Sequence, residues 1–167
     1  MTQRILTTKL LGKLTYDKEK GILTDAVIPL DGKNVILDFD VFEGITSEVV
    51  FQDIVTLTDQ IPKLYINAKK TILEQFGENN IISFYFDYHI DNMPNEVLEI
   101  TQVDTFKKIS SKLLVDKLVL SKAWFSLNLD DEIELTFDFT LLPNDSDELL
   151  VVRFNRNEEI IDLSHES

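Results

Sequence analysis

The chain of 167 residues contains no cysteine. This absence excludes thiol nucleophiles, disulfides and thiolate metal sites, and it is typical of proteins from a reducing compartment. Cationic residues are also few, because 16 Lys and Arg stand against 30 Asp and Glu, which leaves a formal net charge of −14. Repulsion between like charges makes nucleic acid and anionic lipid surfaces poor partners. The charge favours a basic protein partner, with no nucleic acid and no membrane.

Glycine is scarce, and long apolar runs are missing. The five glycines are isolated from one another and form neither GxGxxG nor a P-loop. No backbone cradle for nucleotide phosphates is therefore predicted, and we expect no cofactor. No run approaches the ~20 apolar residues that a membrane-spanning helix needs, and residues 1–10 lack the apolar segment of a signal peptide. We expect a cytoplasmic protein whose residues 1–167 form a single domain.

The N-terminal part alternates apolar and polar residues with the period of β-strands. Strands are predicted within residues 9–17, 21–30 and 34–44. Asp31 and Gly32 separate the last two, and Gly32 can take the positive φ of a tight hairpin turn at low steric cost. In the third segment Val35, Leu37, Phe39 and Val41 alternate with Ile36, Asp38 and Asp40. We therefore predict a three-stranded meander.

The hydrophobic period changes to about 3.6 after Gly44. Ser47 can accept hydrogen bonds from the free amides of a first helix, which carries its apolar residues at helical spacing. Pro62 fits the first turn of a second helix because no intrahelical donor is needed there, and Gly77 ends that helix. A further helix is predicted over residues 105–115 with Asp104 as its cap. The middle of the chain is thus expected to be helical.

The strand period returns in the C-terminal third of the chain. Apolar residues occupy alternate positions within residues 119–129 and 133–141, which is typical of strands with one buried and one solvent-exposed face. Leu150, Val152 and Phe154 alternate in the same way, and Ile161 and Leu163 resume the alternation after residues 155–157. This last segment is predicted to be a β-hairpin. The whole pattern indicates an α+β fold in which antiparallel strands at both ends of the chain pack against a central helical layer.

One candidate metal site lies in the sequence FDYHIDNMP. On a strand, Asp87, His89 and Asp91 would share one face and could hold a divalent metal for a hydrolase. On a helix, the ~100° step between residues turns His89 away from the two carboxylates. Asn79 or Asn80 can cap a helix here and Pro94 can end one, so a helix is slightly favoured.

A second pattern, Ser164-His165-Glu166, resembles a hydrolytic triad only in composition. Adjacent side chains on a strand point to opposite faces, whereas a triad needs three groups that converge. We predict no catalytic residue here and expect His165 to be an exposed histidine at the end of a strand.

The acidic residues that alternate with apolar ones are candidates for partner binding. Strand geometry places Asp38, Asp40, Glu132, Glu134 and Asp138 on the solvent side of their own strands. The two groups share one face only if their strands are neighbours. Trp124, the single tryptophan, is predicted on the face opposite to Phe125, together with Leu118 and Leu120. Core packing is favoured there, and an interface anchor is the alternative.

The stretch from residue 64 to the C-terminus resembles a known bacterial family. YINAKKTILEQFGENN, DDEIELTFDFTLLPNDSDELLVV and DELLVVRFNRNEEIIDLSHES are similar to the family catalogued as domain of unknown function 2004. The resemblance implies a compact α+β protein without an assigned activity, and a loose association with immunity partners of toxins. It supplies no site residue. We therefore favour a non-enzymatic binding protein, with an immunity protein for a basic toxin as its specific form and the metal-dependent hydrolase as the alternative.

Overall fold

The computed structural model describes residues 3–40 and 42–167 and has an α+β fold. Its strands are β1 (Gln3–Thr8), β2 (Gly12–Asp17), β3 (Gly21–Ile22), β4 (Ala26–Leu30), β5 (Lys33–Phe39), β6 (Val119–Leu127), β7 (Ile133–Thr140), β8 (Leu149–Phe154) and β9 (Ile160–Glu166). Its helices are α1 (Glu48–Glu74), α2 (Asn80–Asn92), α3 (Pro94–Thr101), the 3₁₀ turn at Phe106–Lys108 and α4 (Ser111–Lys117). The predicted arrangement, with strands at both ends of the chain and a helical layer between them, is confirmed. None of the described helices is both long enough and apolar enough to span a bilayer.

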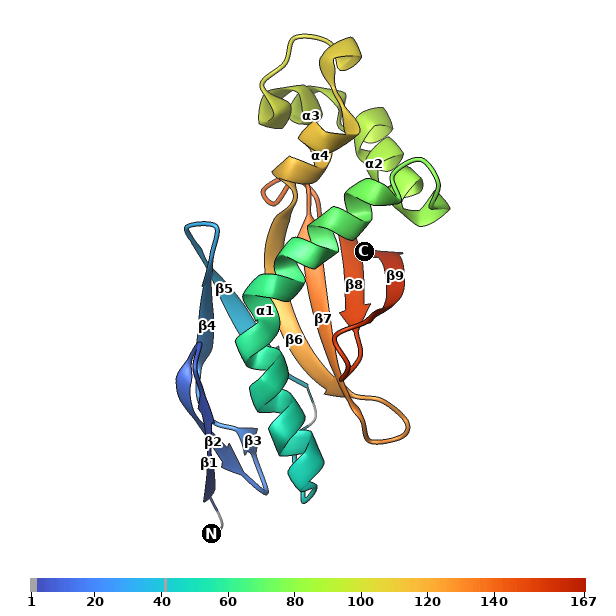
Figure 1. The fold of residues 1–167 in the computed structure, drawn as a ribbon. Helices are drawn as coiled ribbons and strands as arrows, with labels where there is room; N and C mark the ends of the chain where they lie inside the picture. The colour runs from blue at the N-terminus through green and yellow to red at the C-terminus, as the bar shows by residue number, and fades with distance from the viewer. Residues whose placement is uncertain (1–2, 41) are drawn as a thin grey trace.

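The strands form two sheets, and the predicted N-terminal meander is divided between them. One sheet has the order β1-β2-β3, and the other has the order β4-β5-β6-β7-β8-β9. In the larger sheet β5 pairs in parallel with β6, and every other pair is antiparallel. Figure 1 shows α1 running diagonally across one face of this sheet, with α2, α3 and α4 gathered at one end. The crossover from β5 to β6 passes through all the helices, which allows the parallel pairing.

The first hairpin begins earlier than predicted. β1 and β2 pair from Gln3↔Asp17 to Thr8↔Gly12, so the predicted strand over residues 9–17 is partly a turn. The predicted turn between β4 and β5 is confirmed, since Asp31 and Gly32 have φ values of 48° and 71°. Two consecutive positive φ values suit the right-handed twist of a two-residue hairpin. The predicted strand position of Val41 lies outside the described residues.

α1 is a single helix, so the predicted break before Pro62 is wrong. The helix begins after Ser47, whose side chain accepts from the amide of Val50, and it continues through Pro62. Proline removes one backbone donor from the helix interior. On either side of it Ile61 and Leu64 are buried, as are eight other residues of the helix. Burial of this long apolar face holds the helix together across the missing hydrogen bond.

The smaller helices follow their caps. Asn79 accepts from the amide of Ile81 and starts α2, as predicted, and Pro94 starts α3. The helix predicted over residues 105–115 is divided, because Thr105 caps the 3₁₀ turn and Ser110 caps α4. Ser110 has extended backbone angles (φ −98°, ψ 159°), which a continuous helix cannot contain. Thr105 therefore takes the capping role expected of Asp104.

The core lies between α1 and the inner face of the six-stranded sheet. Phe125, Phe137 and Phe139 from the sheet are fully buried, as are Ile54 and Leu57 from α1. The small sheet packs against the N-terminal end of α1. Its residues Leu6, Leu14 and Tyr16 are buried, and the ring of Tyr16 lies 4.9 Å from that of Phe51. One apolar helix face thus holds both sheets in place.

Two register shifts change the face on which particular residues lie. A shift between Leu120 and Lys122 places Leu120 in the core, although uninterrupted alternation predicts it beside Trp124. A shift between Arg153 and Phe154 pairs Phe154 with Ile160, and Ile161 is left 47% exposed instead of facing the core. A bulge inserts one extra residue into a strand and reverses the phase beyond it. The two predictions that assumed a constant period are therefore wrong.

Candidate functional site

The three residues of the candidate metal site do not converge. They lie on α2, where Asp87 and Asp91 are exposed while His89 is fully buried. The helical step turns the imidazole into the protein and the two carboxylates toward solvent. Within residues 3–40 and 42–167 no group of three or more His, Asp or Glu side chains is placed to hold a metal ion. The strand arrangement that the hydrolase hypothesis required is not formed.

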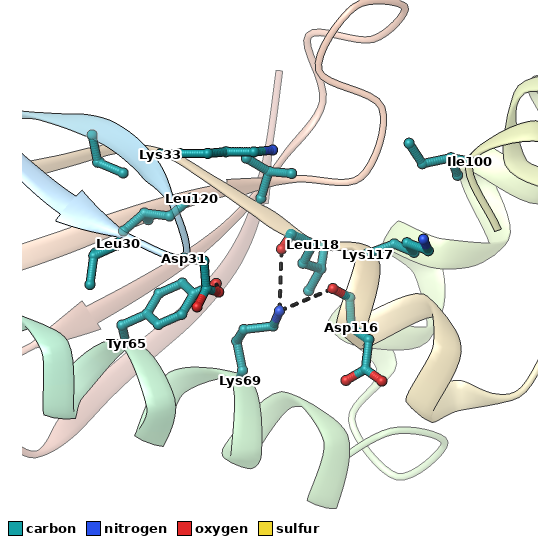
Figure 2. Close-up of a pocket in the computed structure, with 12 residues that line it drawn as sticks. Leu30, Asp31, Lys33, Tyr65, Lys69, Ile100, Asp116, Lys117, Leu118 and Leu120 are labelled. Carbon is teal, nitrogen blue, oxygen red and sulfur yellow. Dashed lines mark hydrogen bonds between the residues drawn. The ribbon is translucent and has the colours of Figure 1, made fainter.

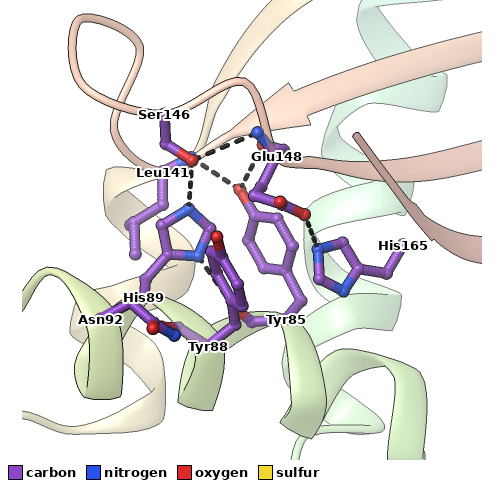
Figure 3. A network of polar contacts seen from close by, with 8 residues as sticks. All are labelled: Tyr85, Tyr88, His89, Asn92, Leu141, Ser146, Glu148 and His165. Carbon is purple, nitrogen blue, oxygen red and sulfur yellow. Dashed lines mark hydrogen bonds and ion pairs between the residues drawn. The ribbon is translucent and has the colours of Figure 1, made fainter.

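His89 instead binds the loop that connects β7 to β8 (Figure 3). Its Nδ1 lies 2.8 Å from the carbonyl oxygen of Tyr85, and its Nε2 lies 3.1 Å from Oγ of Ser146. Because a carbonyl can only accept, Nδ1 carries the proton and Nε2 accepts from the serine hydroxyl. Oγ of Ser146 also accepts from the amide of Glu148. The serine and histidine are paired as a nucleophile and base would be, but full burial of the ring makes the pair a clamp between the loop and α2.

Tyr85 extends the same polar network. Its hydroxyl accepts from the amide of Leu141 at 2.8 Å and donates to the carbonyl oxygen of Glu148 at 3.4 Å. Burial is the main cause that raises the pKa of this hydroxyl, so it stays protonated. The two ends of the β7–β8 loop are therefore held to one tyrosine side chain.

His165 is not the exposed terminal histidine that the sequence predicted. Its Nε2 contacts Oε2 of Glu148, and the side chains are only 13% and 14% exposed. Its ring also packs edge-on against the ring of Tyr85, with centroids 5.2 Å apart. The hydroxyl of Ser164 donates to Glu166, so Ser164, His165 and Glu166 do not converge, as strand geometry predicts. The long-range contact with Glu148 left no signal in the local pattern.

The buried histidine predicts a pH dependence of stability. Burial lowers the pKa of His89 more than the hydrogen bond to the Tyr85 carbonyl raises it. As the pH falls below about 6.5, the unfolded chain binds a proton at this position that the folded chain does not. The contribution of His89 to the free energy of unfolding is therefore complete above that pH. It declines as the pH falls toward the pKa of His89 in the folded state. Urea unfolding between about pH 7.5 and about pH 5.5 should show the free energy of unfolding falling, with a His89 share of at most ~1.4 kcal/mol per pH unit.

A pair of variants isolates the contribution of His89. The His89→Gln variant should lose its share of the pH slope even if the whole curve lies lower. The His165→Gln variant still contains the buried ring of His89, so it should retain that share of the slope. Equal slopes in the wild type and in His89→Gln would contradict the assignment.

The candidate partner-binding residues lie mainly on the outer face of the six-stranded sheet, the face turned away from α1. Strand register aligns two rows of side chains across this face. The first row is Val27, Ile36, Lys122, Asp138, Val151 and Ser164, and the second is Asp38, Trp124, Thr136, Arg153 and Asp162. One further pair on this face is Ser126 on β6 with Glu134 on β7. All these residues fall outside the hydrophobic core cluster.

The two acidic groups of the sequence therefore share one continuous surface. Asp38 on β5 and Asp138 and Glu134 on β7 flank the central strand β6. Asp40 follows β5 directly and its amide donates to the carbonyl oxygen of Phe125, while Glu132 is exposed in the turn before β7. The parallel pairing of β5 with β6 brings them together, which the sequence left undecided.

Three of these carboxylates, Asp38, Glu132 and Glu134, pair with cations of the same chain. Lys122 lies 2.9 Å from Asp38 and lowers the pKa of that carboxyl. Arg153 lies 3.7 Å from Glu134. Arg156, in the β8–β9 turn, lies 3.9 Å from Glu132 but 3.0 Å from Asp53 on α1, so it bridges the end of the sheet to the helix. Such partly exposed pairs each contribute at most ~1 kcal/mol. These pairs order the side chains of the surface. Because each pair is weak, a cation of a partner protein can displace it.

Trp124 lies at the centre of the outer face rather than in the core. Its Nε1 donates to Oδ2 of Asp138 at 3.1 Å, and it is half-buried among neighbouring side chains. Burial raises the pKa of Asp138 more than this hydrogen bond lowers it. Val27 and Ile36 on the same face are 46% and 61% exposed. The sequence placed Trp124 on the correct face, but core packing, the favoured role, is wrong.

Comparisons with protein-family models, with curated proteins and with solved structures found no match.

Proposed function

We propose that this chain is a non-enzymatic binding protein that receives a basic protein on the outer face of its six-stranded sheet. The observation that carries the proposal is the placement of Trp124 at the centre of an acidic surface outside the core. In the specific form that the family resemblance implies, the partner is a basic toxin and the chain is a cytoplasmic bacterial immunity protein.

The charges of this surface support a cationic partner. Its carboxylates are Asp38, Asp40, Glu132, Glu134, Asp138 and Asp162, and they outnumber the cations Lys122 and Arg153. A partner's Lys or Arg can displace a cation of this chain because exposed ion pairs are weak. Complementary charge chiefly accelerates association and orients the encounter.

Affinity would come from the apolar centre of the surface. Tryptophan is among the residues that most often carry binding energy, particularly where surrounding side chains exclude water. Ile36 and Val27 extend the apolar area toward the β4 edge of the sheet. The charged residues around them correspond to the polar rim of a protein interface.

The partner can be identified by crosslinking from this face. A photoreactive amino acid at Ser126, on the outer face, should capture a basic protein in cells that also contain the natural partner. The same group at Ile66, which is 68% exposed on α1, should not capture it. Capture of the same protein from both positions, or only of acidic proteins, would contradict the proposal.

Charge reversal should then slow association with the captured protein. The Asp40, Glu132 and Glu134 triple change to Lys should lower the association rate constant by at least about tenfold at low salt and flatten its dependence on salt. The control reverses Asp87, Asp91 and Glu99, which are exposed on α2 and α3, and changes the net charge equally. Biolayer interferometry at several salt concentrations measures both. Equal slowing in the two variants would mean that total charge, rather than this surface, governs binding.

A further inference from the structure

A cavity lies beside the C-terminal half of α1, away from the small sheet. Its volume is about 330 Å³, and it lies between α1, the β4–β5 turn, α3 and the junction of α4 with β6 (Figure 2). Its apolar walls come from Leu30, Val35, Ile100, Leu118 and Leu120. This volume is at the lower end of the range for small-molecule sites. The cavity is formed on the α1 side of the sheet and is separate from the outer face.

Three lysines line this cavity although the protein as a whole is strongly acidic. Lys69 reaches it from α1, Lys33 from β5 and Lys117 from α4. The ammonium of Lys69 donates to the carbonyl oxygens of Asp116 and Leu118 at 3.2 and 3.3 Å. A lysine is well placed there because the carbonyls at the C-terminal end of a helix are electronegative. Lys69 thus fixes a positive charge at the base of the cavity.

The two carboxylates of the lining are already engaged. Asp31 accepts a hydrogen bond from the hydroxyl of Tyr65, and Asp116 pairs with Lys112 outside the cavity lining. Within residues 3–40 and 42–167, no carboxylate oxygen lies within 4.0 Å of the ammonium of Lys33 or Lys117. Figure 2 shows these two lysines on different sides of the cavity, one extending from the β4–β5 hairpin and the other beside α3. Asp31 keeps its charge because its partner is a neutral hydroxyl, so three lysines against two carboxylates leave an excess of one positive charge in the lining.

We propose that this cavity binds a small organic anion with an apolar body, of the class of medium-chain carboxylates. The apolar walls would receive the hydrocarbon part, and Lys33, Lys69 and Lys117 would attract the carboxylate. A buried or half-buried ammonium favours an anionic partner because charge pairing strengthens as water is excluded. This site is independent of the proposed protein-binding surface.

Sodium hexanoate is a suitable probe of the wild-type protein. In ¹H–¹⁵N NMR titrations it should bind saturably with Kd below ~1 mM and shift the amides around Leu118 and Lys33. Hexanol tests the apolar body alone and hexylammonium tests the opposite charge, and both should bind at least about tenfold more weakly. Absence of saturable binding up to ~10 mM, or equal binding of hexanol, would overturn the proposal.

A matched pair of double variants tests the role of the lysines. Lys33→Ala with Lys117→Ala should weaken hexanoate binding at least about tenfold, because two of the three ammonium groups at the cavity are removed. Lys70→Ala with Lys107→Ala removes two exposed lysines outside the cavity lining and should leave Kd within about twofold of wild type. Circular dichroism verifies that each variant is folded. Equal loss of binding in the two double variants would show that net charge alone attracts the probe, and an unchanged Kd in the first would remove Lys33 and Lys117 from the site.

Discussion

Replacing Phe154 by Ala should lower the free energy of unfolding by about 3 to 5 kcal/mol. The ring of Phe154 is fully buried and packs at 5.2 Å from the ring of Phe137 in an edge-on arrangement. β8 lies inside the sheet between β7 and β9, so the sheet cannot easily close over the space left by the ring. The cost therefore includes a cavity as well as the lost burial of apolar surface. Urea unfolding followed by circular dichroism measures it.

The same substitution at Phe84 provides the control. This ring is 62% exposed on α2, so its removal should cost less than about 1 kcal/mol. Similar losses at the two positions would mean that Phe154 does not occupy a rigid part of the core. The comparison also tests whether the C-terminal hairpin is integral to the fold.

Replacing Trp124 by Ala should weaken binding of the protein partner by at least about 30-fold, equivalent to ~2 kcal/mol. The indole lies at the centre of the outer face, where Asp138 orients it through the hydrogen bond to Nε1. An aromatic ring that is already ordered loses little conformational entropy on binding. The change in Kd is measured by isothermal titration calorimetry with the partner protein that crosslinking from Ser126 identifies.

Two further variants make the result for Trp124 specific. Trp124→Phe retains much of the apolar area without the N–H group, so its affinity should fall between those of wild type and Trp124→Ala. Phe106→Ala truncates a 39% exposed ring on the 3₁₀ turn, outside the outer face, and should not change Kd. If Trp124→Ala remains folded and binds as tightly as wild type, the tryptophan only supports the sheet.

Several parts of the fold could be predicted because they depend on residues close together in the sequence. Ser47 and Asn79 satisfy backbone amides two or three residues away, so their capping roles are visible without any tertiary contact. Asp31 and Gly32 take left-handed angles for local steric reasons. Regular alternation also identified β7 correctly, because a sheet with one face in the core imposes that period on each strand.

The candidate sites were less predictable because they depend on contacts between distant segments. His165 meets Glu148 and Tyr85 only after β9 pairs with β8 and α2 packs beside them. The position of His89 was decided by α2, since the alternating and helical patterns of residues 80–90 overlap in the sequence. The cavity with its three lysines likewise combines residues from β5, α1 and α4.

The types of most elements, the capping residues and the acidic character of the chain could be read without any tertiary contact. These properties follow from local hydrogen bonding, from the period of apolar residues and from composition. Three features depend instead on contacts between distant segments: β5 pairs in parallel with β6, α1 continues through Pro62, and bulges redirect Leu120 and Ile161. In each case the energy of burying apolar surface between distant segments outweighs a local preference that is worth only a few kcal/mol.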